Sequence, residues 1–198
     1  MKKQVIFSCA AVVSAVAGQA SATVYTDSAS FMGALSASYT NGFASAVPGP
    51  SADLNFSDGT FSYTVGASGA GGSGLYNDTG LISTDSALDG ILVTFTSGNV
   101  TAVGGNMWAT AISVFPILAQ VTVSLSDGTV ESFASSSAAD YRGFTSGVVI
   151  TSIFIDADDS LANAWSTLDN LTVGTTIPAP ASVAMLGLGG LVATRRRR

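Results

Sequence analysis

The sequence of 198 residues contains no histidine and one cysteine, Cys9. Ser-His-Asp and Cys-His catalysis, most zinc sites and any disulfide framework need an imidazole or a pair of thiols, so these chemistries are excluded. A chain of this length has room for one modest domain and short additional segments.

Positive charge is almost missing from the middle of the chain. Arg142 is the one interior cation, and the remaining Lys and Arg residues are Lys2, Lys3 and the four C-terminal arginines. All thirteen acidic residues lie between Asp27 and Asp169, so this interior carries a charge of −12 between two basic ends. Because nucleic-acid binding depends on cations that meet phosphates, we expect no nucleic-acid partner.

The N-terminus has the layout of a secretory signal peptide. Lys2 and Lys3 precede an apolar run of 13 residues from Val5 to Ala17, and an Ala-x-Ala cleavage site follows at Ala20 and Ala22. The run is too short to span a bilayer core of about 30 Å. We expect residues 1–22 to be removed on export, and we assign Cys9 to this segment rather than to a lipid anchor.

The C-terminus carries a second targeting pattern. Pro178-Ala179-Pro180 begins a stretch rich in Gly, Leu and Ala that runs to Thr194, and the chain then ends in Arg195, Arg196, Arg197 and Arg198. As a helix, residues 179–194 would reach about 24 Å, enough to lodge transiently in a membrane. The arginines would stay cytoplasmic. A core helix is the alternative, and four consecutive arginines without acidic partners argue against it.

Residues 177–198 resemble the PEP-CTERM sorting signal of bacterial exported proteins, with Ala179 where that family usually has Glu. The resemblance implies that Pro178, Ala179 and Pro180 form the recognition motif of an exosortase. It also implies that a short transmembrane helix holds the precursor in the inner membrane while the arginines stop transfer. Cleavage would release the domain to the cell surface or the extracellular matrix. The partners implied are exosortase and the export machinery. The domains attached to such signals vary widely, so the signal is an address and not a function.

Between the two signals, apolar and small polar residues alternate with a period of two, which is typical of half-buried strands. The segments concerned are Phe61–Val65, Ile91–Thr96, Val121–Leu125 and Ile150–Ile155. Turn residues at Ser57-Asp58-Gly59, Ser97-Gly98-Asn99 and Ser126-Asp127-Gly128 predict three hairpins.

Only one segment favours a helix, where Asp27 is a candidate cap and Phe31 and Leu35 share a face; Ala46–Pro50 is predicted to be a loop. We therefore predict an all-β fold over residues 23–176, a single antiparallel β-sandwich or jelly-roll-like domain. Such a domain buries roughly 70% of the surface of its unfolded chain. Segments including Phe95–Asn106, Val121–Thr129 and Leu168–Val173 resemble β-sandwich exoproteins that carry the same sorting tail. That resemblance implies no activity.

Gly66–Gly74 superficially has the composition of a phosphate-binding loop. A nucleotide loop requires a preceding strand, a following helix and usually a lysine, so we predict a flexible surface loop instead.

Carboxylates are the remaining source of site chemistry. Asp156, Asp158, Asp159 and Asp169 form a candidate calcium site, since calcium takes carboxylate oxygens, and a solvated acidic loop is the alternative. Asp127 and Glu131 are the one pair worth testing for glycoside hydrolysis, but a hairpin turn should expose both to water. We predict no enzymatic activity and no cofactor other than this calcium hypothesis.

Aromatic side chains give a non-catalytic alternative, because sugar rings stack their C–H faces on exposed aromatics. Trp108, Tyr141 and Trp165 are the candidate ligand-binding residues, against the alternative that both tryptophans belong to the core. The sequence thus predicts an exported, structural or adhesive surface protein. Binding of carbohydrate such as exopolysaccharide is the second hypothesis, and a secreted hydrolase or an ice-binding protein ranks below both.

Overall fold

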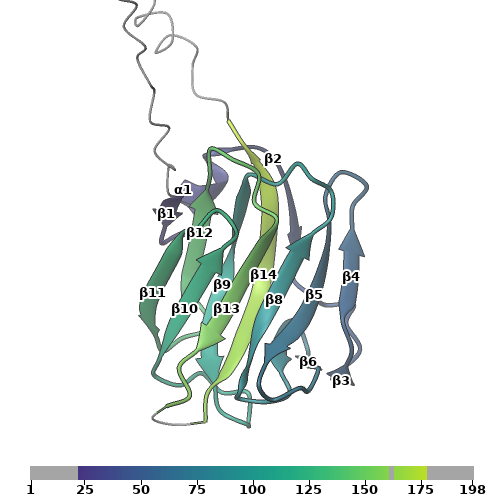
Figure 1. Cartoon of the computed structure of the whole chain (residues 1–198), viewed down its shortest axis with the longest axis vertical. Coiled ribbons are helices and arrows are strands. Elements are labelled where there is room, and N and C mark those ends of the chain that lie inside the picture. The colour runs from purple at the N-terminus through teal and green to yellow at the C-terminus, as the bar shows by residue number, and fades with distance from the viewer. Residues whose placement is uncertain (1–21, 161–162, 178–198) are drawn as a thin grey trace, which may run out of the picture.

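The computed structural model describes residues 22–160 and 163–177, and these form two antiparallel sheets that face each other (Figure 1). The prediction of an all-β, antiparallel fold is confirmed. In chain order the elements are β1 (Thr23–Tyr25), α1 (Ser28–Met32), β2 (Leu35–Asn41), β3 (Gly49–Ser51), β4 (Leu54–Ser57), β5 (Ser62–Gly69), β6 (Leu75–Asp78), β7 (Leu81–Thr84), β8 (Asp89–Phe95), β9 (Ala102–Thr110), β10 (Ala119–Leu125), β11 (Val130–Ser135), β12 (Tyr141–Thr145), β13 (Ser152–Ala157) and β14 (Trp165–Thr176).

The larger sheet has eight strands in the order β1-β12-β9-β14-β7-β6-β3, with β2 beside β14. Along one edge, β14 pairs with β9. Along its other edge it pairs first with β7 and then with β2. The change of partner lies at a bulge between Asp169 and Thr172, where Asn170 adopts the left-handed conformation with φ 48°.

The smaller sheet has six strands in the order β11-β10-β13-β8-β5-β4. All four predicted strand segments are strands of this sheet, namely β5, β8, β10 and β13, with ends shifted by a few residues. Their alternate side chains, such as Ile91, Val123 and Ile155, pack against Met107 and Leu168 of the larger sheet. Full burial of each such side chain contributes about 1.5–3 kcal/mol relative to exposure.

Two of the three predicted hairpins are confirmed. The turns at Gly59 (φ 92°) and Gly128 (φ 91°) join β4 to β5 and β10 to β11. The third prediction is wrong, because the turn at Gly98 leads from β8 in the smaller sheet to β9 in the larger one. Both edges of β8 are already paired, with β13 and β5, so the strand that follows has no free edge there.

The predicted helix forms but is shorter than expected. The Asp27 carboxylate caps it by accepting a 2.8 Å hydrogen bond from the Ser30 amide. The helix ends at Met32, so Leu35 is the first residue of β2 and not a helical partner of Phe31. Both side chains still pack in one cluster, with Tyr141. The predicted loop Ala46–Pro50 also differs, since Gly49 and Pro50 begin the edge strand β3.

The glycine-rich segment is not a free surface loop. Its first four residues, Gly66–Gly69, belong to β5 and pair with β8. The amides of Gly71 (2.8 Å), Gly72 (3.3 Å) and Ser73 (3.2 Å) then donate to the carboxylate of Asp89, as does the Ser73 hydroxyl (3.0 Å). The loop therefore does cradle an anion, but the anion is a side chain of the same chain.

The described chain enters and leaves the sandwich at the same end (Figure 1). Thr23 pairs with Thr145, Thr145 with Ala102, and Ala102 with Gly174, so these residues form one row across the sheet. Trp165, at the other end of β14, lies about 35 Å away along the strand.

Most of the predicted targeting residues lie outside the described residues. This holds for Ala20, for the motif Pro178, Ala179 and Pro180, and for Arg195, Arg196, Arg197 and Arg198. Ala22 is described: it is 9% exposed, and its amide donates to Thr129 Oγ1 at 2.8 Å. Cleavage after Ala22 would remove this contact. In residues 22–160 and 163–177 no helix has the length and apolarity needed to cross a membrane.

Candidate functional site

The three aromatic residues expected to bind a ligand occupy different environments. Trp108 is 2% exposed, and Tyr141 is buried against Phe31, with ring centroids 6.0 Å apart. The prediction of a shared, exposed platform is therefore wrong for these two, because neighbouring elements cover them. Trp165 is only half-buried, since it is the first residue of its strand at the end of the sandwich.

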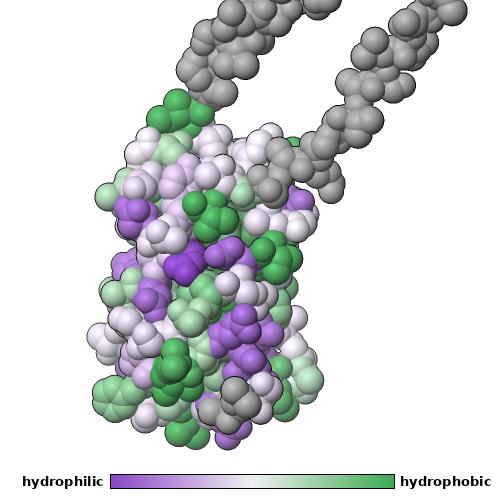
Figure 2. Space-filling model, turned by 90° about the vertical axis from the view of Figure 1, so that its left-hand side faces the viewer, coloured by the Kyte–Doolittle hydropathy of each residue, from purple (hydrophilic) through white to green (hydrophobic). Residues whose placement is uncertain are grey.

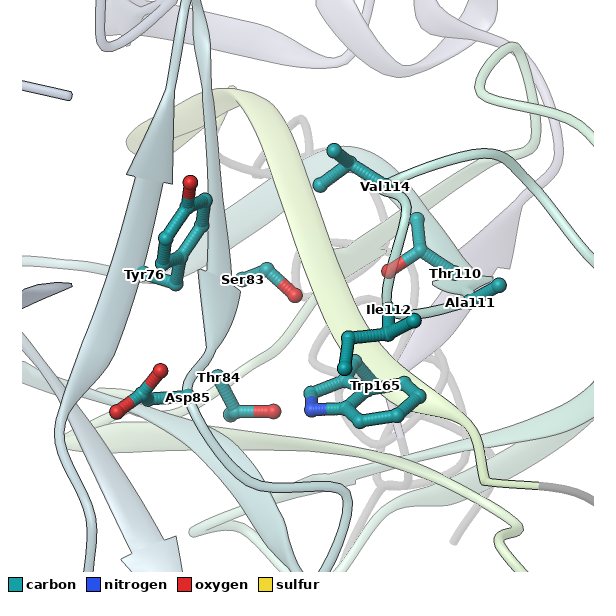
Figure 3. Close-up of a pocket in the computed structure, with 9 residues that line it drawn as sticks. All are labelled: Tyr76, Ser83, Thr84, Asp85, Thr110, Ala111, Ile112, Val114 and Trp165. Carbon is teal, nitrogen blue, oxygen red and sulfur yellow. The ribbon is translucent and has the colours of Figure 1, made fainter. Parts of the chain in front are cut away.

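Trp165 lines a pocket of about 200 Å³ (Figure 3). Four strands of the larger sheet and the loop between β9 and β10 supply its walls. The residues that line it are Tyr76, Ser83, Thr84, Asp85, Thr110, Ala111, Ile112, Val114 and Trp165.

Strand register explains why these side chains meet. Tyr76 of β6 pairs with Ser83 of β7, and Ser83 pairs with Thr167 of β14. Two residues earlier in β14, Trp165 pairs with Thr110 of β9. Paired residues, and residues two apart in a strand, project from the same face of a sheet, so this row lies on one surface.

Hydroxyl groups form the floor of the pocket. The buried Thr167 Oγ1 lies 3.1 Å from Ser83 Oγ and 2.9 Å from Thr110 Oγ1, and Ser83 also donates to the Ser166 carbonyl at 3.1 Å. Three strands thus contribute a continuous chain of hydroxyl hydrogen bonds. A hydroxyl carries two acceptor lone pairs, so such a chain can accept further hydrogen bonds from a ligand.

The sides of the pocket are apolar and aromatic. Ile112 lies directly beside the Trp165 ring, and Tyr76 stands on the opposite side (Figure 3). Ile112 is 85% exposed, and Val114 takes a left-handed backbone conformation with φ 58°. Such strained backbone at a non-glycine residue is concentrated at functional sites.

Two further polar groups complete the lining. Asp85 is exposed and is the one charged residue among those that line the pocket. The Thr84 hydroxyl points towards Trp165 (Figure 3) and is buried without a hydrogen-bond partner among the described residues. A buried hydroxyl left without a partner costs roughly 1–3 kcal/mol.

The predicted calcium ligands do not come together. Asp156 follows the core residue Ile155 in β13, so it projects from the outer face of the smaller sheet. Asp169 follows the core residue Leu168 in β14 and projects from the outer face of the larger sheet. Within the described parts of the chain, no group of three or more acidic, His or Cys side chains is arranged to hold a metal ion.

The charges of these aspartates are set locally. Partial burial, and then the neighbouring Asp159 and Asp158, raise the pKa of Asp156. Hydrogen bonds from Ser160 lower the pKa of Asp158, while burial raises that of Asp169. Asp169 also accepts hydrogen bonds from the Asn170 amide and, at 2.9 Å, from its side chain, which braces the bulge of β14.

Asp127 and Glu131 also have structural roles. Burial opposes ionisation of Asp127, but hydrogen bonds from Ser146 (2.7 Å) and Thr129 (2.9 Å) outweigh it and lower its pKa. A general acid requires the opposite shift. Glu131 lies 3.9 Å from Arg142, whose guanidinium stacks 3.8 Å above the Phe133 ring.

A second hollow, of about 380 Å³, lies beside β3 and β4. Apolar residues such as Val47, Pro48 and Phe56 provide much of its lining. The amide nitrogen of Asn77 is already bonded to the Val47 carbonyl and to Ser51 Oγ, both at 3.1 Å. This hollow therefore has fewer free polar groups than the pocket at Trp165.

Sequence analysis identified Trp165 but missed the rest of this pocket. Ser83, Thr84 and Asp85 form an ordinary polar segment at a strand end, and Ile112 and Val114 lie in an unremarked loop. Their proximity depends on the pairing of β14 with both β7 and β9, which no local pattern reveals. Comparisons of the chain with protein-family models and with curated proteins found no match.

Proposed function

We propose that this protein is an exported, non-catalytic component of the bacterial cell surface or extracellular matrix, with a structural or adhesive role. The proposal takes the two terminal signals as addresses for export and for exosortase processing. The domain between them is the working part.

The arrangement of the chain ends is the observation that carries this proposal. Ala22 and Ile177 lie at one end of the sandwich, whereas the pocket and its apolar loop lie near the other. In that loop Ile112, Phe115 and Leu118 are 85%, 72% and 77% exposed. A domain held by its C-terminal segment would therefore present the pocket and loop away from the membrane, as an adhesive protein requires.

The rest of the surface fits this role. On the side that carries β11, hydrophobic and hydrophilic residues are interspersed in small patches (Figure 2). Exposed apolar side chains gathered in one loop are more informative than the same residues scattered singly. The pocket contains one carboxylate, whereas glycoside hydrolysis uses two that lie about 5–10 Å apart.

Mass spectrometry and fractionation of the protein from its native host test the proposal. We expect a product that begins near Thr23, ends near Pro178-Ala179-Pro180 and is recovered from the cell surface or the medium. Replacement of Arg195, Arg196, Arg197 and Arg198 by alanine should leave export intact and impair processing. Recovery of the full-length chain, arginines included, from the soluble cytosol would contradict the proposal.

Carbohydrate binding is the second candidate function. The pocket at Trp165 favours it, because an aromatic wall stands above a floor of hydroxyl groups. Such a site suits adhesion to an exopolysaccharide.

A further inference from the structure

We infer that the pocket at Trp165 binds one uncharged pyranose ring, either a free hexose or the terminal unit of a glycan. This inference rests on the second candidate function above and specifies its site and ligand class. The pocket combines three features that such a ring requires: limited size, an aromatic wall, and hydroxyl groups without opposing positive charge.

The size of the pocket limits the ligand to a single ring. Its volume of about 200 Å³ is below the roughly 300–1,000 Å³ of sites for drug-sized ligands. A longer oligosaccharide can therefore place one unit inside, with the rest extending over the exposed loop that contains Ile112 and Phe115.

The walls suit the two kinds of surface on a pyranose. Its C–H groups form an apolar face, which the ring of Trp165 can cover with support from Ile112. Tyr76 closes the opposite side and brings a phenolic hydroxyl as well as a ring (Figure 3). Aromatic residues with one polar handle are common at binding surfaces for this reason.

The floor supplies the partners for sugar hydroxyls. Ser83 and Thr110 are fixed by their hydrogen bonds to Thr167 and keep unused acceptor lone pairs. The Thr84 hydroxyl beside Trp165 has no partner within the described residues. A ligand hydroxyl bonded to Thr84 would remove the cost of that unpaired group, which gives binding a favourable contribution.

Charge selects against acidic ligands. Of the nine lining residues, none is cationic and Asp85 is anionic. The cation of the described domain, Arg142, is instead engaged with Phe133 and Glu131. A uronic acid or a sugar phosphate would therefore meet repulsion, whereas Asp85 can accept hydrogen bonds from a neutral sugar.

Titration of the processed protein with glucose, galactose and mannose tests the inference, with glucuronic acid as the charged comparison. Intrinsic fluorescence is a suitable signal, since Trp165 lies in the pocket and Trp108, the other tryptophan, is buried. We expect at least one neutral hexose to bind saturably, with a Kd of about 1 mM, and glucuronic acid to bind at least about tenfold more weakly. A matching oligosaccharide distinguishes the sources: tighter binding than the free hexose indicates a glycan terminus, and equal binding a free sugar.

Variants locate the site. Trp165→Ala and Tyr76→Ala should each weaken binding by about tenfold or more, with Trp165→Phe retaining part of the affinity. Phe115→Ala is the matched control, because Phe115 is an exposed aromatic residue of the same loop that does not line the pocket. Its affinity should be unchanged, and circular dichroism should show that all variants are folded.

Three results would overturn the inference: no saturable binding of a neutral hexose at 50-fold the expected Kd, binding that Trp165→Ala leaves unchanged, or a preference for glucuronic acid. These results do not bear on export, which the processed termini report separately. A protein that reaches the surface but binds no sugar contradicts this inference alone. A protein that binds sugar but stays unprocessed in the cytosol contradicts the proposed localisation alone.

Discussion

Substitution of Asp89 by asparagine should destabilise the protein by removing the charge around which the glycine-rich loop closes. Asp89 is 1% exposed, and its carboxylate accepts four hydrogen bonds from Gly71, Gly72 and Ser73. Burial opposes ionisation of this group, but hydrogen bonds from Ser73, Gly71 and Gly72 outweigh it and lower its pKa. The native structure is therefore built for the ionised form.

The magnitude follows from the hydrogen bonds that asparagine cannot accept. Each contributes about 1 kcal/mol net, so the four together contribute about 4 kcal/mol. Asn keeps one acceptor oxygen, which serves Gly71 and Gly72, but its amino group faces the Ser73 amide, and two donors cannot bond. We expect Asp89→Asn to lower the free energy of unfolding by about 2 kcal/mol at pH 7.

Urea unfolding at pH 7 and at pH 3 measures this difference. The folded pKa of Asp89 lies below the unfolded value, so its contribution is present above pH 3.8 and is lost as the pH falls through the folded pKa. The gap between wild type and Asp89→Asn should therefore shrink at low pH. Asp53→Asn, at an exposed position, is the control and should change stability by less than about 0.5 kcal/mol. A loss below about 0.5 kcal/mol for Asp89→Asn, or a gap that does not depend on pH, would refute the reasoning.

Three other predictions concern close packing and titration. Gly143→Ala would place Cβ 2.6 Å from Cδ2 of the buried Phe31 and should cost about 2 kcal/mol, whereas Gly147→Ala, with open space around Cβ, should change stability by less than about 0.5 kcal/mol; urea unfolding of both variants makes the comparison. Hydrogen bonds outweigh burial and lower the pKa values of Asp127 and Asp140 as well as Asp89, so we expect cooperative acid unfolding below about pH 4, and a far-UV circular dichroism signal that stays constant down to pH 2 would contradict this. Burial raises the pKa of Asp169, so the stability associated with its protonated form is lost as the pH rises through that value; Asp169→Asn should gain stability relative to wild type between pH 4 and pH 7, and a constant difference in thermal melting would count against it.

Local chemistry made several features of this protein predictable. Alternation of apolar and polar residues identified β5, β8, β10 and β13, because a strand with one buried face imposes a period of two on its own sequence. Asp27 identified the start of α1 because capping involves a residue only three positions away. The turns at Gly59 and Gly128 were predictable for the same reason, since their left-handed backbone favours glycine.

The third turn shows where such reasoning ends. Gly98 has the same left-handed backbone, yet its turn crosses between sheets, because the two edges of β8 were already occupied by strands distant in sequence. Similarly, the sequence contained no sign that Asp89 would fill the loop formed by Gly71 and Gly72. Both outcomes depend on which strands become neighbours.

The two tryptophans separate these contributions most clearly. Composition and period-two patterning determined that Trp108 and Trp165 would belong to an acidic, all-β domain between two basic ends. Only the tertiary structure decided that Trp108 is buried within β9 while Trp165 opens onto a pocket at the end of β14. The exposure of a side chain depends on elements brought together by long-range pairing, and a residue's immediate sequence neighbours carry no record of that pairing.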